Sequence, residues 1–171
     1  HNLITTNPET RLDHAFGQSA ADWITMRGGL KAGFPAAVAF PEDSGQVAKV
    51  IAWAAENNCR IIPHGGGTSV AGHLSVDPAG PPIISLSLAR MNRLLELDET
   101  NRLARFQAGV RGPDLEAALR ARGWTLGHFP QSFEYSTLGG WVACRSVGQF
   151  SLAYGRMDSL FAGGRLQTPS G

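Results

Sequence analysis

Apolar residues between positions 36 and 62 change from a strand-like run to a helical stripe and back again. Ala37–Phe40 and Arg60–Ile62 are short apolar or β-branched runs of the kind found in buried strands. The apolar residues between them that repeat at helical spacing are Val47, Val50, Ile51, Ala54 and Ala55. Asp43 and Gln46 are spaced to cap this helix at its start, and Asn57–Asn58 ends it. The pattern predicts a β-α-β unit, whose helical crossover implies parallel strands.

From residue 82 onward the pattern is mainly that of antiparallel structure. Ile83–Leu88 is a further predicted strand. Leu94–Asp98 and Leu103–Ala108 flank the turn signal Glu99–Asn101, which predicts a β-hairpin. Apolar residues then recur at helical spacing between Pro113 and Gly123, so a helix is expected there.

The last third of the chain is less regular. Gly127–Thr137 has few residues that could be buried, and long ordered loops of this kind are usually functional. A short helix is expected to begin near Gly139. Leu160–Thr168 is predicted to be half of a strand pair that stops at the turn signal Pro169–Gly171. A strand without a partner indicates a truncated domain, and its open edge is expected to pair with another copy of the chain.

These elements predict an α+β fold, with a small parallel β-α-β subdomain followed by part of a second, mainly antiparallel α/β subdomain. We divide the chain into an N-terminal extension over residues 1–35, a first subdomain over residues 36–80 and a truncated second subdomain over residues 81–171. The extension contains one candidate helix, Ala20–Met26, and Gly28–Gly29 would end it. Trp53 and Trp141 are both expected in the core.

Composition narrows the class of partner. The chain has 171 residues, 43% of them hydrophobic, and a net charge of +1, so no nucleic-acid partner is expected. Its two cysteines, Cys59 and Cys144, lack metal-ligand spacing, which favours a reducing compartment and no metal site. A secretory signal pattern is absent from the start of this sequence, so we expect a cytoplasmic location.

The most informative motif is the run Pro63-His64-Gly65-Gly66-Gly67-Thr68-Ser69, which follows the predicted strand directly. Consecutive glycines let peptide N–H groups approach a ligand and form an anion-binding nest. The motif is not a Walker loop, because no lysine follows Lys49, and Val70 stands where the dinucleotide fingerprint needs its third glycine. Two interpretations stay open at this point: an anion-binding loop, or a flexible turn that binds nothing.

Three segments taken together resemble a known family. They are Ile61–Val70, Ile84–Arg93 with the hairpin after it, and Gly127–Ala143 continued by Arg145-Ser146 and Tyr154-Gly155-Arg156. Their order and spacing are similar to the FAD-binding domain of the vanillyl-alcohol oxidase/p-cresol methylhydroxylase superfamily. The third segment resembles the alkyldihydroxyacetonephosphate synthase branch more than the D-lactate dehydrogenase or glycolate oxidase branches.

The resemblance implies two α/β subdomains that hold FAD, with Pro63, His64, Gly65, Gly66, Gly67, Thr68 and Ser69 wrapped around its pyrophosphate. It further implies that Gln131, Ser132, Phe133, Glu134, Tyr135, Ser136 and Thr137 line the cofactor. Cys144, Arg145, Ser146 and Val147 would lie along its adenosine or flavin side. His64 and Val147 depart from the residues usual in the family. Thr68 stands where some members carry a covalently linked histidine, so non-covalent FAD is expected. We expect His128 to hold its loop through a backbone hydrogen bond.

The resemblance also implies an activity for a longer protein: flavin-dependent exchange of an acyl for an alkyl group on a dihydroxyacetone phosphate ester. The family's cap domain and catalytic groups lie beyond the matched segments, so we assign no catalytic residue, and this portion alone is expected to be inactive. One alternative is an FAD-linked dehydrogenase of 2-hydroxy acids such as D-lactate or glycolate. An alternative of another class is a non-catalytic nucleotide-binding module or an inactive fragment.

Overall fold

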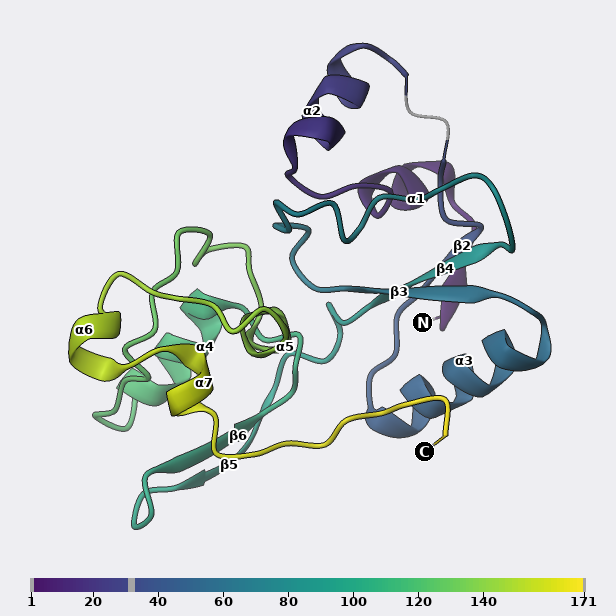
Figure 1. Cartoon of the computed structure of the whole chain (residues 1–171). Helices are drawn as coiled ribbons and strands as arrows, with labels where there is room; N and C mark the ends of the chain where they lie inside the picture. Colours follow the sequence, from purple (N-terminus) through teal and green to yellow (C-terminus); the bar gives the residue numbers. More distant parts are fainter. Residues whose placement is uncertain (1, 31–32, 171) are drawn as a thin grey trace. The chain divides into compact units, whose positions relative to one another are not determined.

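The computed structural model describes residues 2–30 and 33–170 and divides the chain into two compact units (Figure 1). The first unit runs to Arg90 and includes the last residues from Leu166, and the second spans Met91–Arg165. The division expected from the sequence, at residues 80 and 81, differs from this one by about ten residues. Each unit is described separately below.

The first unit is built on a four-stranded sheet with the order β1-β2-β4-β3. Its strands are β1 (Ile4–Thr5), β2 (Ala37–Ala39), β3 (Arg60–His64) and β4 (Ile83–Ser87). The parallel pairs β2–β4 and β3–β4 confirm the prediction of parallel strands, and β1 pairs antiparallel with β2. All five residues of β4 are buried, because the strand lies between two neighbours.

This topology corrects two assignments made from the sequence. β4 had been placed in the second subdomain, but it is an inner strand of the first sheet. The sequence pattern predicts an extension over residues 1–35, yet Ile4 pairs with Ala39 and Thr5 pairs with Val38. Strand partners are chosen by contacts distant in sequence, and a local pattern of apolar residues does not show which sheet a strand joins.

Three helices belong to the first unit: α1 (Pro8–Asp13), α2 (Ala20–Arg27) and α3 (Ser44–Glu56). The caps of α3 are those predicted, since Asp43 accepts a hydrogen bond from the backbone N–H of Gln46, and the helix ends before Asn57. Val47, Val50 and Ala54 form its buried face. Trp53, expected in the core, is 45% exposed, so that prediction is wrong: its position one residue before Ala54 turns it away from the buried stripe.

The second unit begins with the antiparallel hairpin of β5 (Leu94–Asp98) and β6 (Leu103–Phe106), as predicted. Its helices are α4 (Gly112–Arg120), α5 (Leu138–Ala143), α6 (Ser151–Tyr154) and α7 (Met157–Leu160). The fully buried residues that form its core are Val110, Leu115, Leu119, Trp141 and Met157. Trp141 is therefore a core residue, as expected, and it links α5 to the other elements of this unit.

The C-terminal strand prediction is wrong. Met157–Leu160 is helical, and residues 161–168 form no strand. The hydrophobic residues here suggest a strand, but Leu166 is 83% exposed and pairs with none of the strands in the described part of the chain. The expected pairing of an open strand edge with another copy therefore loses its basis in this segment. Gly171, part of the expected turn, lies outside the described residues.

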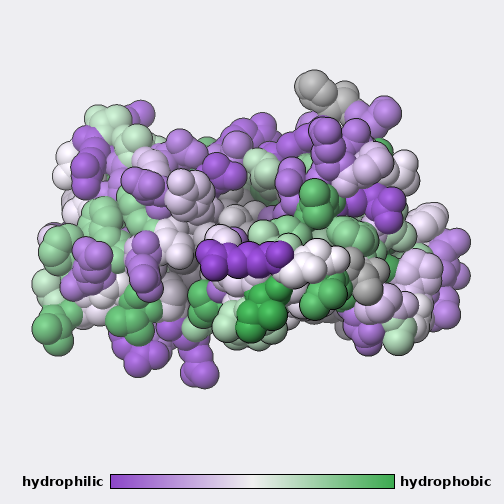
Figure 2. Space-filling model, turned by 90° about the horizontal axis from the view of Figure 1, so that it is seen from above, coloured by the Kyte–Doolittle hydropathy of each residue, from purple (hydrophilic) through white to green (hydrophobic). Residues whose placement is uncertain are grey.

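The face shown in Figure 2 has hydrophobic residues interspersed among hydrophilic ones. Within residues 2–30 and 33–170, no helix is both long and apolar enough to cross a bilayer.

Candidate functional site

The glycine motif lies at the carboxyl end of β3. Pro63 and His64 are still part of the strand, and Gly65–Gly67 form a bend immediately after it. Gly67 has φ +71°, a left-handed conformation that glycine adopts without a steric penalty. Within the described part of the chain, the peptide N–H groups from Gly65 to Thr68 donate to no protein acceptor. A bend with free peptide N–H groups at the carboxyl end of a parallel strand is suited to an anion.

The side chain of His64 lies beneath this bend. It is only 7% exposed, and among the described residues neither of its ring nitrogens has a hydrogen-bond partner. A Cβ atom added at Gly67 would lie 3.5 Å from its Nε2, so the loop folds over the imidazole. The ring also packs against His14, with centroids 4.2 Å apart.

Burial, together with the electrostatic influence of the neighbouring His14 ring, lowers the pKa of His64 to about 4. The backbone of Gly65 acts in the opposite direction and raises the pKa of His64, although it is not placed to form a hydrogen bond with the ring. The imidazole is therefore neutral at pH 7. It fills the space under the loop without placing a charge there.

The end of the motif offers hydroxyl groups. Thr68 and Ser69 are half-buried and follow the bend directly. The Ser69 hydroxyl lies 3.1 Å from Nδ1 of His73, an exposed residue of the same connection. His73 therefore contacts the end of the glycine motif through its Nδ1 atom.

A second group of candidate residues surrounds a pocket of about 280 Å³ in the second unit. Its lining residues are Phe129, Pro130, Gln131, Ser132, Phe133, Glu134, Tyr135 and Gln149. The structure thus brings together five of the residues singled out from the sequence, Gln131 to Tyr135. Gln149 was missed, because its backbone N–H bonds to the carbonyl of Phe129, a contact across twenty residues that no local pattern shows.

Ser136 and Thr137 are buried rather than open to the pocket. The Ser136 hydroxyl donates to the Ser132 carbonyl and accepts a hydrogen bond from the indole N–H of Trp141, each at 2.7 Å. Thr137 precedes α5, and its hydroxyl has no partner among the described residues. Ser136 therefore orders the loop, whereas the Thr137 hydroxyl stays unpaired.

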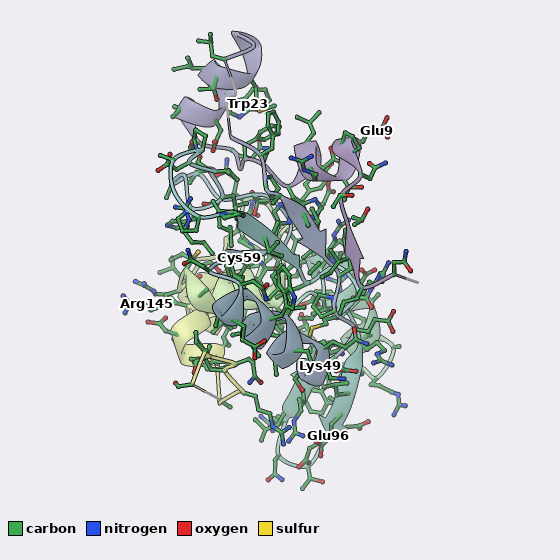
Figure 3. All side chains as sticks on the ribbon, turned by 90° about the vertical axis from the view of Figure 1, so that its right-hand side faces the viewer. Glu9, Trp23, Lys49, Cys59, Glu96 and Arg145 are labelled. Atoms are coloured by element: carbon green, nitrogen blue, oxygen red, sulfur yellow. The ribbon has the colours of Figure 1, made fainter. Side chains whose placement is uncertain are left out.

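Cys144–Val147 follow α5. Arg145 adopts φ +47°, unusual for a residue with a side chain, and it projects outward from the ribbon (Figure 3). Cys144 and Val147 are exposed as well. Ser146 is the member of this group that is tied to the preceding loop, because its hydroxyl lies 2.7 Å from Nε2 of His128.

That contact corrects the expectation for His128. Its side chain holds the loop through the Ser146 hydroxyl instead of a backbone group, and the ring packs edge-on against Trp141. His128 is 1% exposed, and burial lowers the pKa of its imidazole. The buried neutral ring thus joins the loop before the pocket to the segment after α5.

Glu116 in α4 is a further residue that the sequence analysis missed. Its carboxylate accepts hydrogen bonds from the Thr125 hydroxyl at 2.7 Å and from the N–H groups of Leu126 and Gly127. Glu116 is 3% exposed and also pairs with Arg120, one helical turn later. The available signal was an acidic residue directly after Leu115, on the buried side of a predicted helix.

Comparison with known proteins adds a family. The profile described as FAD binding domain matches residues 35–171. Alkyldihydroxyacetonephosphate synthase of Trypanosoma brucei brucei is 37% identical over 170 residues, and that of Caenorhabditis elegans is 38% identical over 162 residues. The alignments cover 98% and 93% of this chain but only 28% and 27% of those proteins. A solved structure of alkyldihydroxyacetonephosphate synthase matches with a TM-score of 0.94 at 35% identity, over 99% of this chain and 32% of the other.

Proposed function

Because the chain belongs to the FAD-binding domain family, we propose that Pro63–Ser69 holds the diphosphate of FAD, and that the cofactor is bound non-covalently. The observation that carries this proposal is the set of unpaired peptide N–H groups from Gly65 to Thr68. A diphosphate has several anionic oxygens that need fixed donors, and peptide dipoles supply them without a lysine. Gly67 suits this bend because its φ of +71° is strained for any residue with a side chain, whereas a Cβ there would only touch the His64 imidazole at 3.5 Å.

Non-covalent attachment is supported by the residues near the loop. Thr68 directly follows the glycines, at the position where some members of the family carry the histidine that is linked to the flavin. A threonine there does not provide that imidazole. His73, a histidine of the same connection, is in contact with Ser69 through Nδ1. Acid precipitation of the flavin-loaded protein should therefore release all flavin into the supernatant.

The pocket of the second unit is proposed to contact the same cofactor. Its walls combine the rings of Phe129 and Phe133, whose centroids lie 4.9 Å apart, with the amides of Gln131 and Gln149. Aromatic faces and amide groups suit a flat heterocycle with polar edges. Arg145 and Ser146 are proposed as further contacts, and Cys144 and Val147 as their flanking residues.

We propose that the complete protein is an enzyme similar to alkyldihydroxyacetonephosphate synthase. The chain spans 28% of the trypanosome relative, and we propose that the substrate site and catalytic groups of the complete protein lie outside the matched part. Bound flavin supplies the electron-accepting ring system that the protein's side chains lack. The proposed reaction is the exchange of an acyl for an alkyl group on a dihydroxyacetone phosphate ester.

A direct test is FAD titration of the full-length apoprotein, followed by flavin fluorescence. The informative variant is Gly67→Ala, with Gly123→Ala as its matched control, because both glycines have a positive φ and Gly123 has nothing within 4 Å. Both changes carry the strain of a side chain at positive φ. Only Gly67→Ala should weaken FAD binding, by about tenfold, which corresponds to roughly 1.4 kcal/mol. Equal affinity of the two variants would contradict the diphosphate assignment.

The reaction can be tested separately. If D-lactate or glycolate reduces the flavin under anaerobic conditions, the function is oxidation of 2-hydroxy acids and the proposed alkyl exchange is wrong. Product formation from an acyl dihydroxyacetone phosphate and a fatty alcohol would support the exchange. The 171-residue chain by itself should turn over neither substrate.

A further inference from the structure

The segment before the family match contacts the end of the glycine motif and the connection that follows it. Residues 2–30 and 33–34 precede the matched range 35–171, yet they fold as part of the first unit. In Figure 1 the purple segment that carries α1 and α2 runs beside the teal connection between β3 and β4. Hydrogen bonds from this segment reach the connection at Ser69 and at Ser75, and Gly33 lies against the Val76 carbonyl.

The first point is at Ser69, the last residue of the motif. The backbone N–H of Gln18 donates to the Ser69 carbonyl at 2.7 Å. The backbone of Gly17 also lies against this oxygen, because a Cβ atom added at Gly17 would be only 2.5 Å from it. Only a glycine lets the two backbones approach this far, so any larger residue must push the loop away.

The second point is at Ser75, further along the connection. Its hydroxyl donates to Oδ1 of Asp22 at 2.6 Å. Oδ2 of Asp22 accepts from the hydroxyl and N–H of Ser19 and from the N–H of Gly17, at 2.7, 3.3 and 3.3 Å. Asp22 is 2% exposed, and it thereby joins both contact points to one buried carboxylate.

The hydrogen bonds to Asp22 favour the ionised form of its carboxylate. Burial alone would raise its pKa, but the hydrogen bonds from Ser75, Ser19 and Gly17 outweigh burial and lower the pKa below its ordinary value. At neutral pH the ionised group keeps all of these donors. A charge-assisted set of hydrogen bonds is about twice as strong as a neutral set.

We propose that Asp22 and Gly17 are positioning residues for the diphosphate loop, and that the N-terminal segment sets the affinity for FAD by fixing Ser69 and Ser75. This inference rests on the proposed function of the loop. The connection between β3 and β4 spans residues 65–82 without a helix or strand, so it depends on outside contacts for order. Donors that are fixed before binding cost less to order when the anion arrives.

The experiment uses the full-length apoprotein and three ligands: FAD, ADP, which has the diphosphate but no flavin, and riboflavin, which has the flavin but no diphosphate. The variants are Gly17→Ala, Ser75→Ala and Asp22→Ala. Gly45→Ala and Asp98→Ala are the matched controls. Gly45 meets only the Asp43 side chain, and Asp98 accepts hydrogen bonds from Asn101 in the β5–β6 turn. Thermal unfolding of each apoprotein is recorded alongside.

Within each variant, the affinities for FAD and for ADP should fall by the same factor. This factor should be about tenfold for Gly17→Ala and several-fold for Ser75→Ala, and the affinity for riboflavin should not change in any variant. Asp22→Asn should restore part of the loss, because an amide can keep the Ser19 and Gly17 contacts and donate to the Ser75 hydroxyl. A selective loss of diphosphate ligands is not what a general loss of stability produces.

Two results would overturn the proposal. One is unchanged FAD and ADP affinity in Gly17→Ala and Ser75→Ala proteins that remain folded. The other is an equal loss for riboflavin, which would mean that the substitutions only destabilise the protein. If the unsubstituted protein binds neither FAD nor ADP, the proposed function itself fails, and that outcome is separate because it appears before any variant is compared.

Discussion

Acidification should destabilise this protein through His64, one of its most deeply buried titratable groups. The imidazole is 7% exposed and lies against His14, with no hydrogen-bond partner for its nitrogens among the described residues. Protonation inside the fold would therefore place an unpaired positive charge under the glycine bend. The perturbation that isolates this effect is His64→Leu, which keeps an apolar group of similar bulk and removes the titration.

The size of the effect follows from the difference between the folded and unfolded pKa. His64 has a pKa of about 4 in the fold and 6.5 when exposed, which corresponds to roughly 3 kcal/mol in the free energy of unfolding. Because the folded pKa is the lower one, the unfolded chain takes up the proton first as the pH falls. The full stability is thus present above pH 6.5, declines between pH 6.5 and 4, and levels off below.

The assay is urea unfolding at a series of pH values from 7.5 to 4.5, for the unsubstituted protein, His64→Leu and His73→Gln. His73 is an exposed histidine of the loop, so its replacement controls for the loss of a histidine from this connection. His128 also has a lowered pKa and contributes to the decline in all three proteins, so the difference between profiles is the quantity to compare. Parallel profiles for the unsubstituted protein and His64→Leu would refute the reasoning.

Three further predictions concern the second unit. Glu116→Ala should lower the free energy of unfolding, measured in urea, by roughly 2–4 kcal/mol, because the Thr125 hydroxyl and the Leu126 N–H lose the buried carboxylate as their acceptor, while the Gly127 N–H keeps only the Thr125 oxygen. Gly112→Ala should lower the free energy of unfolding by roughly 1–3 kcal/mol, because the new Cβ would lie 2.5 Å from the Phe133 ring. Thermal denaturation measures this loss, and an unchanged Tm would contradict the contact. Trp141→Ala should cost about 3–5 kcal/mol and Trp53→Ala far less, and similar losses would show that the two burial assignments are wrong.

Local signals in the sequence were enough for those elements whose causes are local. The capping pair at Asp43 and Gln46, with the apolar stripe behind it, predicted α3, and Glu99–Asn101 between two apolar runs predicted the hairpin. The glycine motif was recognised for the same reason, because its conformational freedom belongs to the residues themselves. Its place at the end of a parallel strand followed from the β-α-β pattern.

Features set by distant contacts could not be predicted in this way. β4 has the composition of any buried strand, and its position between β2 and β3 depends on pairing across many residues. The hydrogen bond from the Ser75 hydroxyl to Asp22 joins residues 53 positions apart, and no local pattern in the sequence shows it. Burial of His64 is likewise a result of packing by His14, a residue of the N-terminal stretch that the sequence division had set apart.

The proposed diphosphate site therefore has three supports that act on different sides of one short loop. β3 fixes where the loop starts, the neutral ring of His64 fills the space beneath it, and the contacts of Gly17, Gln18 and Asp22 hold its return path. Peptide N–H groups bind an anion well only when they already point at it, because reorganising them would cost much of the gain. Of these supports the seven-residue motif carries only the His64 ring, so the same residues grafted onto another strand end should bind ADP far more weakly. We therefore expect affinity for the diphosphate to depend on the first unit as a whole, including the N-terminal residues that lie outside the family match.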